Sequence, residues 1–292
     1  MSESRSEQQV ASHPMAGHDA FSPPEVALMV ETRGVAKAKA PVVTTFVLGV
    51  VAGAFIGLGA VLAITIGTGS ELGFGPTRWL AGIGFSLGLI LVVVAGAELF
   101  TGNNLIVMST VSGNVGVRRL LANWGIVYLG NAIGALSVVA MVYLAEWWRG
   151  DDLGVGVTAL STAAAKTSLP FVVVLVRGIL ANALVCLAVW LAAAGRSVID
   201  KVAAIVFPIS AFVAAGFEHS VANMFFIPMG LALGGQRDVV DAAHIPSAEL
   251  STLDGAGLLN NLVAATIGNV IGGAVLVGLV YWFVYVRPAR PS

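Results

Sequence analysis

The stretch Gly216-Phe217-Glu218-His219-Ser220-Val221-Ala222-Asn223 decides the fold, because it sets an adjacent glutamate and histidine inside an apolar run from Val202 to Leu233. A run of this length can span a bilayer, where an ionisable side chain carries a large desolvation cost unless it faces a pore or a partner. A second stretch, Gly96-Ala97-Glu98-Leu99-Phe100-Thr101-Gly102-Asn103, repeats the G-x-E-x-x-x-x-N spacing within another long apolar segment. The two stretches together predict a paired polar site inside a membrane.

The composition places the chain among all-α polytopic membrane proteins. Of its 292 residues, 57% are hydrophobic and 11% are charged, whereas a soluble domain has about 25% charged residues. The net charge of -1 and the absence of a basic run exclude a nucleic-acid partner. Cys186 is the single cysteine and lies in an apolar run, which excludes an intrachain disulfide and a cysteine metal site. We expect no cofactor and no metal.

The chain divides into a polar start, a short helix, a membrane domain and a short end. The first forty residues contain no compact apolar segment typical of a cleaved signal. From Pro24 onward, Val26, Met29, Val30 and Val35 have the spacing of an amphipathic helix on a membrane surface. The predicted divisions are a disordered cytoplasmic tail over 1–24, an amphipathic cytoplasmic helix over 25–40, a six-span domain over 41–287 and a cytoplasmic tail over 288–292.

Hydropathy predicts six spans, at 42–66, 79–112, 120–147, 168–194, 202–234 and 257–286. The second and fifth are too long and too polar at their centres to be simple helices. Gly96 and Gly102 flank the acidic break in the second span, and Pro208, Gly216 and Pro228 punctuate the fifth. We therefore expect half-helices broken near the midplane, where protein or a water-filled cavity satisfies the irregular backbone.

Basic residues near the ends of the spans favour both termini in the cytoplasm. With that orientation the cytoplasmic segments contain Arg33, Lys37, Lys39, Arg118, Arg119, Arg196, Lys201, Arg287 and Arg290, against Arg78, Arg149, Lys166 and Arg237 outside.

An internal repeat relates the two halves of the chain. Besides the paired acidic stretches, Gly130-Asn131-Ala132-Ile133-Gly134 in the third span returns as Gly268-Asn269-Val270-Ile271-Gly272 in the sixth. Spans one to three therefore match spans four to six in order. An odd number of spans per repeat makes the halves face opposite ways, which is the inverted-topology repeat of many transporters, with the binding site between the broken helices.

The start of each resumed half-helix presents backbone N–H groups and partial positive charge, so two such starts meeting at the midplane favour an anion. Thr101, Asn103, Ser220 and Asn223 are residue types that cap such starts or donate to a bound ion. His219 can donate to a small anion and can also protonate it near neutral pH, so that a weak acid crosses an apolar constriction as a neutral molecule. The alternative is a structural histidine that Glu218 satisfies.

Glu98 and Glu218 are expected to support the broken helices by accepting backbone N–H bonds, with a cation or proton path as the rival interpretation. Lys166 lies at the outer mouth of the fourth span, where a cation raises the local anion concentration, unless it only anchors the helix at the interface. Arg177 lies too deep in that span to reach water easily and is expected to pair with a carboxylate or to face a subunit interface. Apolar residues that narrow a pore, or simply pack, are Phe85, Leu89, Phe100, Val185 and Phe212.

The chain resembles the formate/nitrite transporters, a family that includes formate, nitrite and hydrosulfide channels. The resemblance covers nearly the whole chain from Phe21 onward and rests on three specific signatures. These are Ala97-Glu98-Leu99-Phe100-Thr101, the run Gly178-Ile179-Leu180-Ala181-Asn182-Ala183-Leu184-Val185-Cys186-Leu187-Ala188-Val189-Trp190, and Gly216-Phe217-Glu218-His219-Ser220-Val221-Ala222-Asn223-Met224.

The resemblance implies an aquaporin-like fold of six spans in a homopentamer, with one pore in each protomer and lipid on the central axis. It further implies that His219 is the central histidine, with Thr101 opposite on the loop of the broken second helix and with Asn182 and Asn261 around it. Lys166 matches the lysine of the outer vestibule. Phe85 and Phe212 resemble the outer constriction, and Leu89, Phe100 and Val185 the inner one.

Two departures from the family pattern stand out. Gly102-Asn103-Asn104 follows Thr101 where formate channels commonly have a Ser-Thr pair, and Arg177 takes a position that is usually apolar. The predicted function is a channel or proton-coupled transporter in the bacterial inner membrane for small monovalent anions of weak acids, formate first and nitrite next. Hydrosulfide, acetate and lactate satisfy the same site, and neither the direction of transport nor the choice between channel and proton symport follows from the sequence.

Two other classes share part of this pattern. A neutral-solute channel of the aquaporin type would carry paired N-P-A motifs at the breaks, and the sequence has none. A membrane-embedded enzyme would use Glu218 and His219 as an acid-base pair, but no metal-ligand set or nucleophile accompanies them. We therefore expect no enzyme activity.

Overall fold

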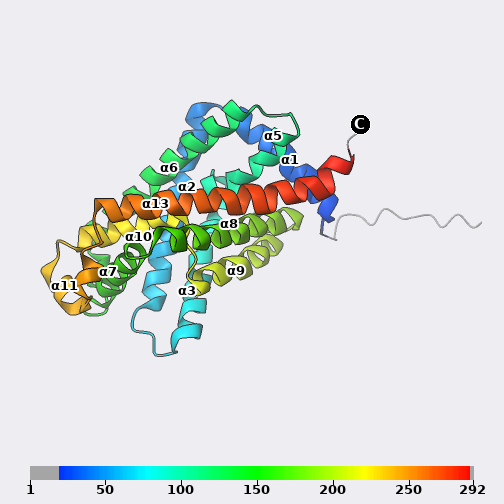
Figure 1. Ribbon diagram of the computed structural model, residues 1–292. Coiled ribbons are helices and arrows are strands. Elements are labelled where there is room, and N and C mark those ends of the chain that lie inside the picture. Colours follow the sequence, from blue (N-terminus) through cyan, green and yellow to red (C-terminus); the bar gives the residue numbers. More distant parts are fainter. Residues whose placement is uncertain (1–19, 290–292) are drawn as a thin grey trace, which may run out of the picture.

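The computed structural model describes residues 20–289, which form an all-helical bundle (Figure 1). The predicted residues 1–19 of the N-terminal tail and 290–292 of the C-terminal tail lie outside this range. Within it, the helices long and apolar enough to cross a membrane are Val42–Gly67, Phe74–Gly96, Val117–Leu144, Phe171–Ala194, Val198–Ala215 and Gly255–Val286. The protein is therefore a multi-pass membrane protein, as the hydropathy indicated.

The α-helices in chain order are α1 (Pro23–Lys39), α2 (Val42–Gly67), α3 (Phe74–Ile90), α4 (Phe100–Asn103), α5 (Val107–Val111), α6 (Val117–Leu144), α7 (Gly154–Thr167), α8 (Phe171–Ala194), α9 (Val198–Ala215), α10 (Ser220–Leu233), α11 (Arg237–Ala243), α12 (Ser247–Leu250) and α13 (Gly255–Val270). The π-helical segments are η1 (Leu91–Gly96), η4 (Ile271–Leu279) and η5 (Trp282–Val286), and the 3₁₀ segments are η2 (Asn104–Ile106), η3 (Trp147–Arg149) and η6 (Arg287–Ala289).

The helix pairs α2–α6 and α8–α13 pack closely at glycines. A Cβ atom added to Gly53 of α2 or to Gly134 of α6 would overlap backbone atoms of the facing helix, at Asn131 and Val50. The second half repeats the arrangement, because a Cβ on Gly268 would overlap the backbone of α8. Glycines four residues apart let helices approach closely in a membrane, where hydrophobic burial gives no drive for association. These glycines fix where the broken helices lie.

Each broken helix turns at a glycine with a positive φ. The helix formed by α3 and η1 ends at Gly96 with φ 87°, and the chain resumes as α4 at Phe100. In the same way α9 is followed by Gly216 with φ 73°, and α10 begins at Ser220. A residue with a Cβ atom adopts this left-handed conformation only at a cost in energy, so both turns favour glycine. Gly102 lies in α4, directly after the first break. The expected interruptions at the prolines are wrong, because Pro208 lies within α9 and Pro228 within α10.

The first helix packs on the bundle through its apolar face. Val26, Ala27 and Val30 of α1 are buried against a cluster that includes Met108 and Trp190. Its start is fixed by a capping box in which Ser22 N–H donates to the Glu25 carboxylate over 2.8 Å. The protein itself therefore covers the apolar stripe that the sequence analysis assigned to a membrane surface.

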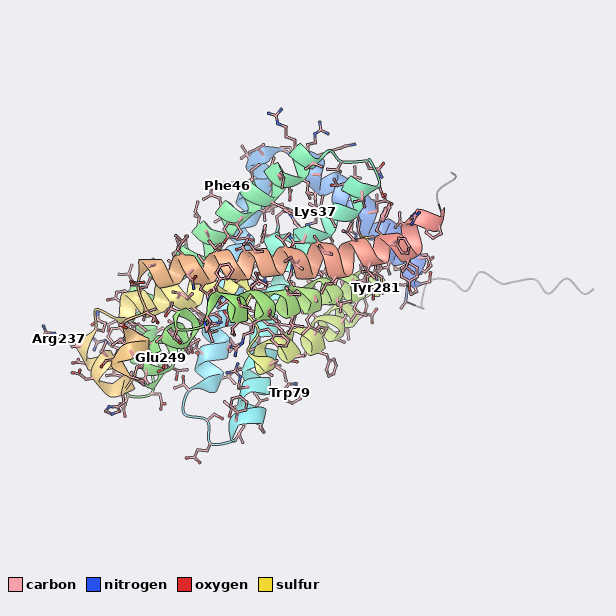
Figure 2. The ribbon with its side chains drawn as sticks, viewed as in Figure 1. Lys37, Phe46, Trp79, Arg237, Glu249 and Tyr281 are labelled. Atoms are coloured by element: carbon pink, nitrogen blue, oxygen red, sulfur yellow. The ribbon has the colours of Figure 1, made fainter. Side chains whose placement is uncertain are left out.

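The two ends of the described chain lie at the same end of the bundle. Figure 1 shows α1 beside the last turns of the chain, whereas α7 and α11 lie at the opposite end. Figure 2 accordingly places Tyr281 towards one end and Arg237 at the other. This arrangement agrees with an even number of spans between the two ends.

Candidate functional site

The two breaks in the helices meet at a hydrogen bond between Thr101 and His219. Thr101 Oγ1 lies 2.9 Å from His219 Nε2. Thr101 has no exposed surface and His219 is 2% exposed. Because Thr101 belongs to α4 and His219 directly precedes α10, the bond joins the two restarted half-helices. The structure thus brings the predicted histidine and threonine together.

Hydrogen bonding fixes the tautomer of His219. The backbone N–H of Ala222 donates to His219 Nδ1 over 3.1 Å, and a backbone amide has no other role than donor. The proton of the neutral ring therefore sits on Nε2 and is donated to Thr101 Oγ1, which leaves the threonine hydroxyl hydrogen free to donate onward. His219 is also the N-cap of α10. The expectation that Ser220 and Asn223 cap this helix is wrong, since the preceding histidine occupies the cap.

Two buried asparagines hold the turns of the broken helices. Asn269 Oδ1 accepts from the Ser220 N–H over 2.8 Å, and its amide donates to the carbonyls of Gly178 and Glu218 at 2.8 and 3.0 Å. Asn131 makes the corresponding bonds to Phe100, Gly49 and Glu98, at 2.9, 2.7 and 2.9 Å. These are the asparagines of the repeated Gly-Asn-x-Ile-Gly motif. Their side chains satisfy backbone groups that an interrupted helix leaves unpaired.

Glu218 is the centre of a buried polar cluster. Lys166 Nζ contacts both its carboxylate oxygens at 3.0 and 3.1 Å. Asn223 Nδ2 donates to Glu218 Oε2 over 2.6 Å and to Asn261 Oδ1 over 2.7 Å. Asn261 in turn donates to the Lys166 carbonyl over 3.0 Å. The carboxylate therefore binds side chains, and the expectation that it accepts backbone N–H groups is wrong.

Glu98 has an equivalent cluster in the first half. Lys37 Nζ donates to Glu98 Oε1 over 2.8 Å and to Asn103 Oδ1 over 3.0 Å. Asn103 Nδ2 donates to Glu98 Oε2 over 2.6 Å and to Asn123 Oδ1 over 3.0 Å. Asn103 thus occupies the place of Asn223, and it too contacts side chains and does not cap a helix. Each of the two clusters therefore contains a lysine, a glutamate and two asparagines.

Sequence reasoning missed Lys37 and Asn123 as members of the site. The repeat contains the signal, since Lys37 precedes Gly49 by twelve residues, as Lys166 precedes Gly178. Asn123 likewise precedes Asn131 by eight residues, which is the spacing from Asn261 to Asn269. Extending the repeat backwards from its glycines would have found both.

Each of the two helix breaks lines a cavity. We call one the Lys166 cavity; it has a volume of about 470 Å³, and its lining includes Arg78, Lys166, Arg177, Glu218 and His219. We call the other the Lys37 cavity; it has a volume of about 380 Å³, and its lining includes Arg33, Lys37, Glu98 and Gly102. Cations outnumber carboxylates in the lining of both cavities. Both favour an anion.

The predicted constriction residues are buried. Phe85 and Phe212 meet edge to face with ring centroids 5.6 Å apart, and the Phe212 ring lies 5.9 Å from the His219 ring. Phe100 and Val185 are 4% and 1% exposed and line neither cavity. Leu89 lines the Lys37 cavity, one helical turn from Phe85 in the Lys166 cavity. That these apolar side chains narrow a path between the cavities stays a prediction.

The two further asparagines expected around His219 contact its neighbours and not its ring. Asn182 Nδ2 donates to the carbonyl of Thr101 over 3.3 Å, to Asn104 Oδ1 over 2.8 Å and to the carbonyl of Asn269 over 2.6 Å. Through these bonds Asn182 holds α4 in position. Asn261 belongs to the Glu218 cluster. Within residues 20–289, neither donates to His219, so both orient neighbours of the histidine and not the ring itself.

Two buried polar atoms beside the histidine have no protein partner among the described residues, the hydroxyl of Ser220 and the Oδ1 atom of Asn223. Asn223 lines the Lys166 cavity. Its Oδ1 is an acceptor only, so it can receive a hydrogen bond from an O–H group of a ligand but not from a bare anion. The cavity thus offers cationic donors to an anion.

Arg177 differs from the expectation that it pairs with a carboxylate. Its Nη1 donates to the carbonyl of Gly216 over 3.4 Å, and no ion pair of Arg177 occurs in the part of the chain that the structure describes. Arg78 donates from Nε and Nη2 to the carbonyls of Ala214 and Val213, each over 3.0 Å. Both guanidinium groups line the Lys166 cavity.

Comparison with known proteins identifies the relatives of this chain. A family profile described as formate/nitrite transporter matches residues 24–283. The formate channel FocA of Escherichia coli strain K12 is 42% identical over 278 residues, which are 92% of this chain and 96% of the relative. The nitrite transporter NirC of the same strain is 36% identical over 242 residues, 82% of this chain and 83% of the relative. A solved structure described as a pentameric formate channel with formate bound aligns with a TM-score of 0.78 at 35% identity, covering 84% of this chain and 98% of that one.

Proposed function

The chain belongs to the formate/nitrite transporter family, and we propose that it conducts small monovalent anions of weak acids across a membrane, with formate as the first substrate and nitrite the next. The observation that carries this proposal is the arrangement of two cation-lined cavities around a buried histidine–threonine pair. The family's channels and transporters include relatives named for formate and for nitrite. Hydrosulfide and the short monocarboxylates acetate and lactate are the alternatives of the same chemical kind.

Capture of the anion begins at Lys166. The Lys166 cavity contains three cationic side chains and one carboxylate, which gives it a formal charge of +2 when His219 is neutral. An anion of one charge is therefore attracted into the cavity, and its concentration there exceeds that in the medium. The attraction weakens with salt, because the Debye length is only about 10 Å at 0.1 M ionic strength.

Passage requires that the anion lose its charge. Phe85, Phe212, Phe100 and Val185 close the path with apolar groups, and an ionised carboxylate in such surroundings is costly by many kcal/mol. A neutral acid has a far smaller penalty. We place the proton transfer to the substrate at His219, where Thr101 supplies a hydroxyl donor.

The geometry of His219 sets a condition on that transfer. The ring shown is neutral, with Nδ1 accepting from the Ala222 amide. An imidazolium carries a proton on both nitrogens, so charging the ring breaks this bond, which is worth about 1 kcal/mol. The neutral ring keeps this bond and is the state to which the site returns after the transfer. Uptake is expected to rise as the external pH falls, because each anion that crosses takes up a proton.

The distribution of basic residues and the similar solved structure support a proposal for orientation and assembly. We propose that the Lys166 cavity opens outside, that both termini are cytoplasmic and that the protein resides in a bacterial inner membrane, in line with the distribution of basic residues. The similar solved structure is described as pentameric, and we propose a homopentamer for this chain, with lipid on its central axis. Nucleic acid has no part in this function.

Two substitutions of His219 test the proton transfer. His219→Asn keeps an acceptor for the Ala222 N–H, because asparagine is a good N-cap, but cannot titrate or reach Thr101 in the same way. His219→Gln keeps an amide long enough to reach Thr101 and also cannot titrate. We expect both variants to fold as pentamers and to lose the acid stimulation of formate uptake into proteoliposomes. Unchanged formate uptake at acid pH in both variants would refute the transfer at His219.

A further inference from the structure

Arg78 and Arg177 form a pair of guanidinium groups beside the turn that precedes His219. Arg177 Nη1 lies 3.4 Å from the carbonyl oxygen of Gly216. Arg78 Nη2 lies 3.1 Å from the point where a Cβ atom on Gly216 would stand. Two groups of like charge therefore approach the same residue. Neither makes an ion pair within residues 20–289, where the carboxylate of the cavity, Glu218, is engaged by Lys166.

The fold does not need a charge at position 177. The backbone carbonyl of Arg177 accepts from the Glu218 N–H over 3.3 Å, and the carbonyl of Leu48 accepts from the Glu98 N–H over 3.2 Å at the equivalent point of the first half. Leucine thus fulfils the same backbone role in the repeat. The guanidinium of Arg177 is consequently an addition to the Lys166 cavity that the support of the broken helix does not explain.

The guanidinium groups are held in place with donors to spare. Arg78 is fixed by the carbonyls of Val213 and Ala214 in the last turn of α9, where the helix dipole favours a cation. Those bonds use Nε and Nη2, and Nη1 has no hydrogen-bond partner among the described residues. Arg177 has one long bond from Nη1 alone. Both side chains are half-buried and line the cavity.

We propose that Arg78 and Arg177 form an anion-binding subsite for small anions with two oxygen acceptors, such as a carboxylate or nitrite, before the anion reaches His219. A guanidinium binds two oxygens with parallel N–H bonds, whereas a lysine ammonium or a spherical anion has no such match. An anion between the two groups also relieves their mutual repulsion. This inference rests on the proposed function and names the chemical class that the Lys166 cavity selects.

The Lys37 cavity supports this assignment by contrast. It has two cations, Arg33 and Lys37, and one carboxylate, Glu98, for a formal charge of +1. The Lys166 cavity has one additional cation, and its two arginines face the same turn. The two cavities therefore differ at position 177, where the equivalent residue of the first half is Leu48.

The test compares Arg177→Leu and Arg177→Lys with the unchanged protein in proteoliposomes, by formate uptake at low ionic strength. Leucine is chosen because Leu48 fills the equivalent position. Arg177→Leu is expected to raise the half-saturating formate concentration about tenfold, the factor that one charge-assisted hydrogen bond contributes, with a smaller effect on the maximal rate. Arg177→Lys keeps the charge but loses the two parallel N–H donors of the guanidinium. Chloride should then compete with formate almost as well as nitrite does.

The matched control is Arg149→Gln. Arg149 pairs with Glu146 over 3.2 Å, does not line the cavity and is exposed, so its loss removes one charge without touching the subsite. An Arg177→Leu half-saturation equal to that of the unchanged protein, or equal shifts in the Arg149→Gln and Arg177→Leu variants, would overturn the subsite while leaving the proposed function standing.

A second measurement does not depend on transport. Phenylglyoxal modifies accessible arginines, and mass spectrometry of the unchanged protein locates the product. Formate and nitrite are expected to slow the modification of Arg177 relative to Arg149, whereas chloride at equal ionic strength is not. If the unchanged protein carries no formate, the proposed function fails and this protection still decides the subsite. Equal protection by chloride and formate would overturn it.

Discussion

Replacement of Asn269 by leucine tests the idea that a buried amide holds the broken fifth span together. The Asn269 side chain has no exposed surface and bonds to the Ser220 N–H and to the carbonyls of Gly178 and Glu218. Leucine has a similar volume and no polar atom. The carbonyl of Gly178 lies inside α8 and keeps its helical partner, so two backbone groups, at Ser220 and Glu218, are left buried without a partner.

The expected magnitude follows from those two groups. Each buried unsatisfied group costs about 1–3 kcal/mol, so Asn269→Leu is expected to cost about 2–6 kcal/mol of unfolding free energy, against a typical total of about 5–15 kcal/mol. With a shift of about 2–4 °C per kcal/mol for a chain of this size, the melting temperature falls by at least about 4 °C. Formate flux is expected to fall as well, since Ser220 directly follows His219.

The assay is thermal unfolding of the purified protein in detergent, followed by loss of the oligomer on size exclusion, alongside proteoliposome flux. Ser137→Ala is the control, because Ser137 is exposed and its hydroxyl bonds only to the carbonyl of Ile133 in its own helix. Asn131→Leu should cost about as much as Asn269→Leu, because Asn131 makes the corresponding bonds in the first half. An Asn269→Leu shift no larger than that of Ser137→Ala would show that the amide does not hold the break.

Three further predictions concern helix packing and the two lysines. Gly134→Ala is expected to lower the melting temperature clearly, because its Cβ would overlap the Val50 carbonyl, whereas Gly125→Ala in the same helix meets no atom within 4 Å and should be neutral or slightly stabilising; equal effects in the two variants would contradict this packing. Lys166→Gln should reduce uptake most at low external formate and low salt, and a reduction that persists unchanged in high salt would argue against electrostatic capture. Lys37→Gln should reduce efflux more than uptake, measured by reversing the formate gradient, and the opposite ranking would reverse the proposed orientation.

Hydropathy and the repeated motifs predicted much of this fold. The six spans, and breaks beside Gly96 and Gly216, follow from apolar runs interrupted by glycine and charge, and such patterns act over a few residues. The prolines misled because a proline does not by itself break a membrane helix: Pro208 and Pro228 stand inside α9 and α10, where neighbouring groups compensate for the missing N–H.

The partners of the charged residues did not follow from local pattern. Glu98 pairs with Lys37, sixty-one positions away in the chain, and Glu218 with Lys166, fifty-two positions away. Local spacing suggested that the glutamates accept N–H bonds from their own turns. In the structure Asn131 accepts from the N–H of Phe100 and Asn269 from that of Ser220. His219 accepts from the N–H of Ala222. An amide can donate and accept in the same place, which a carboxylate cannot, and a turn needs both.

The sequence by itself determined that this chain crosses a membrane six times and carries two equivalent polar breaks, because hydrophobic length and motif order are local properties of the chain. Only the tertiary structure decided which nitrogen of His219 faces Thr101, which lysine meets which glutamate, and that Arg177 faces the Lys166 cavity without a carboxylate partner. Those outcomes depend on where helices distant in sequence come to lie. In an apolar interior each polar group must find its partner across that distance, and the packing of the helices at their glycines determines which partner it meets.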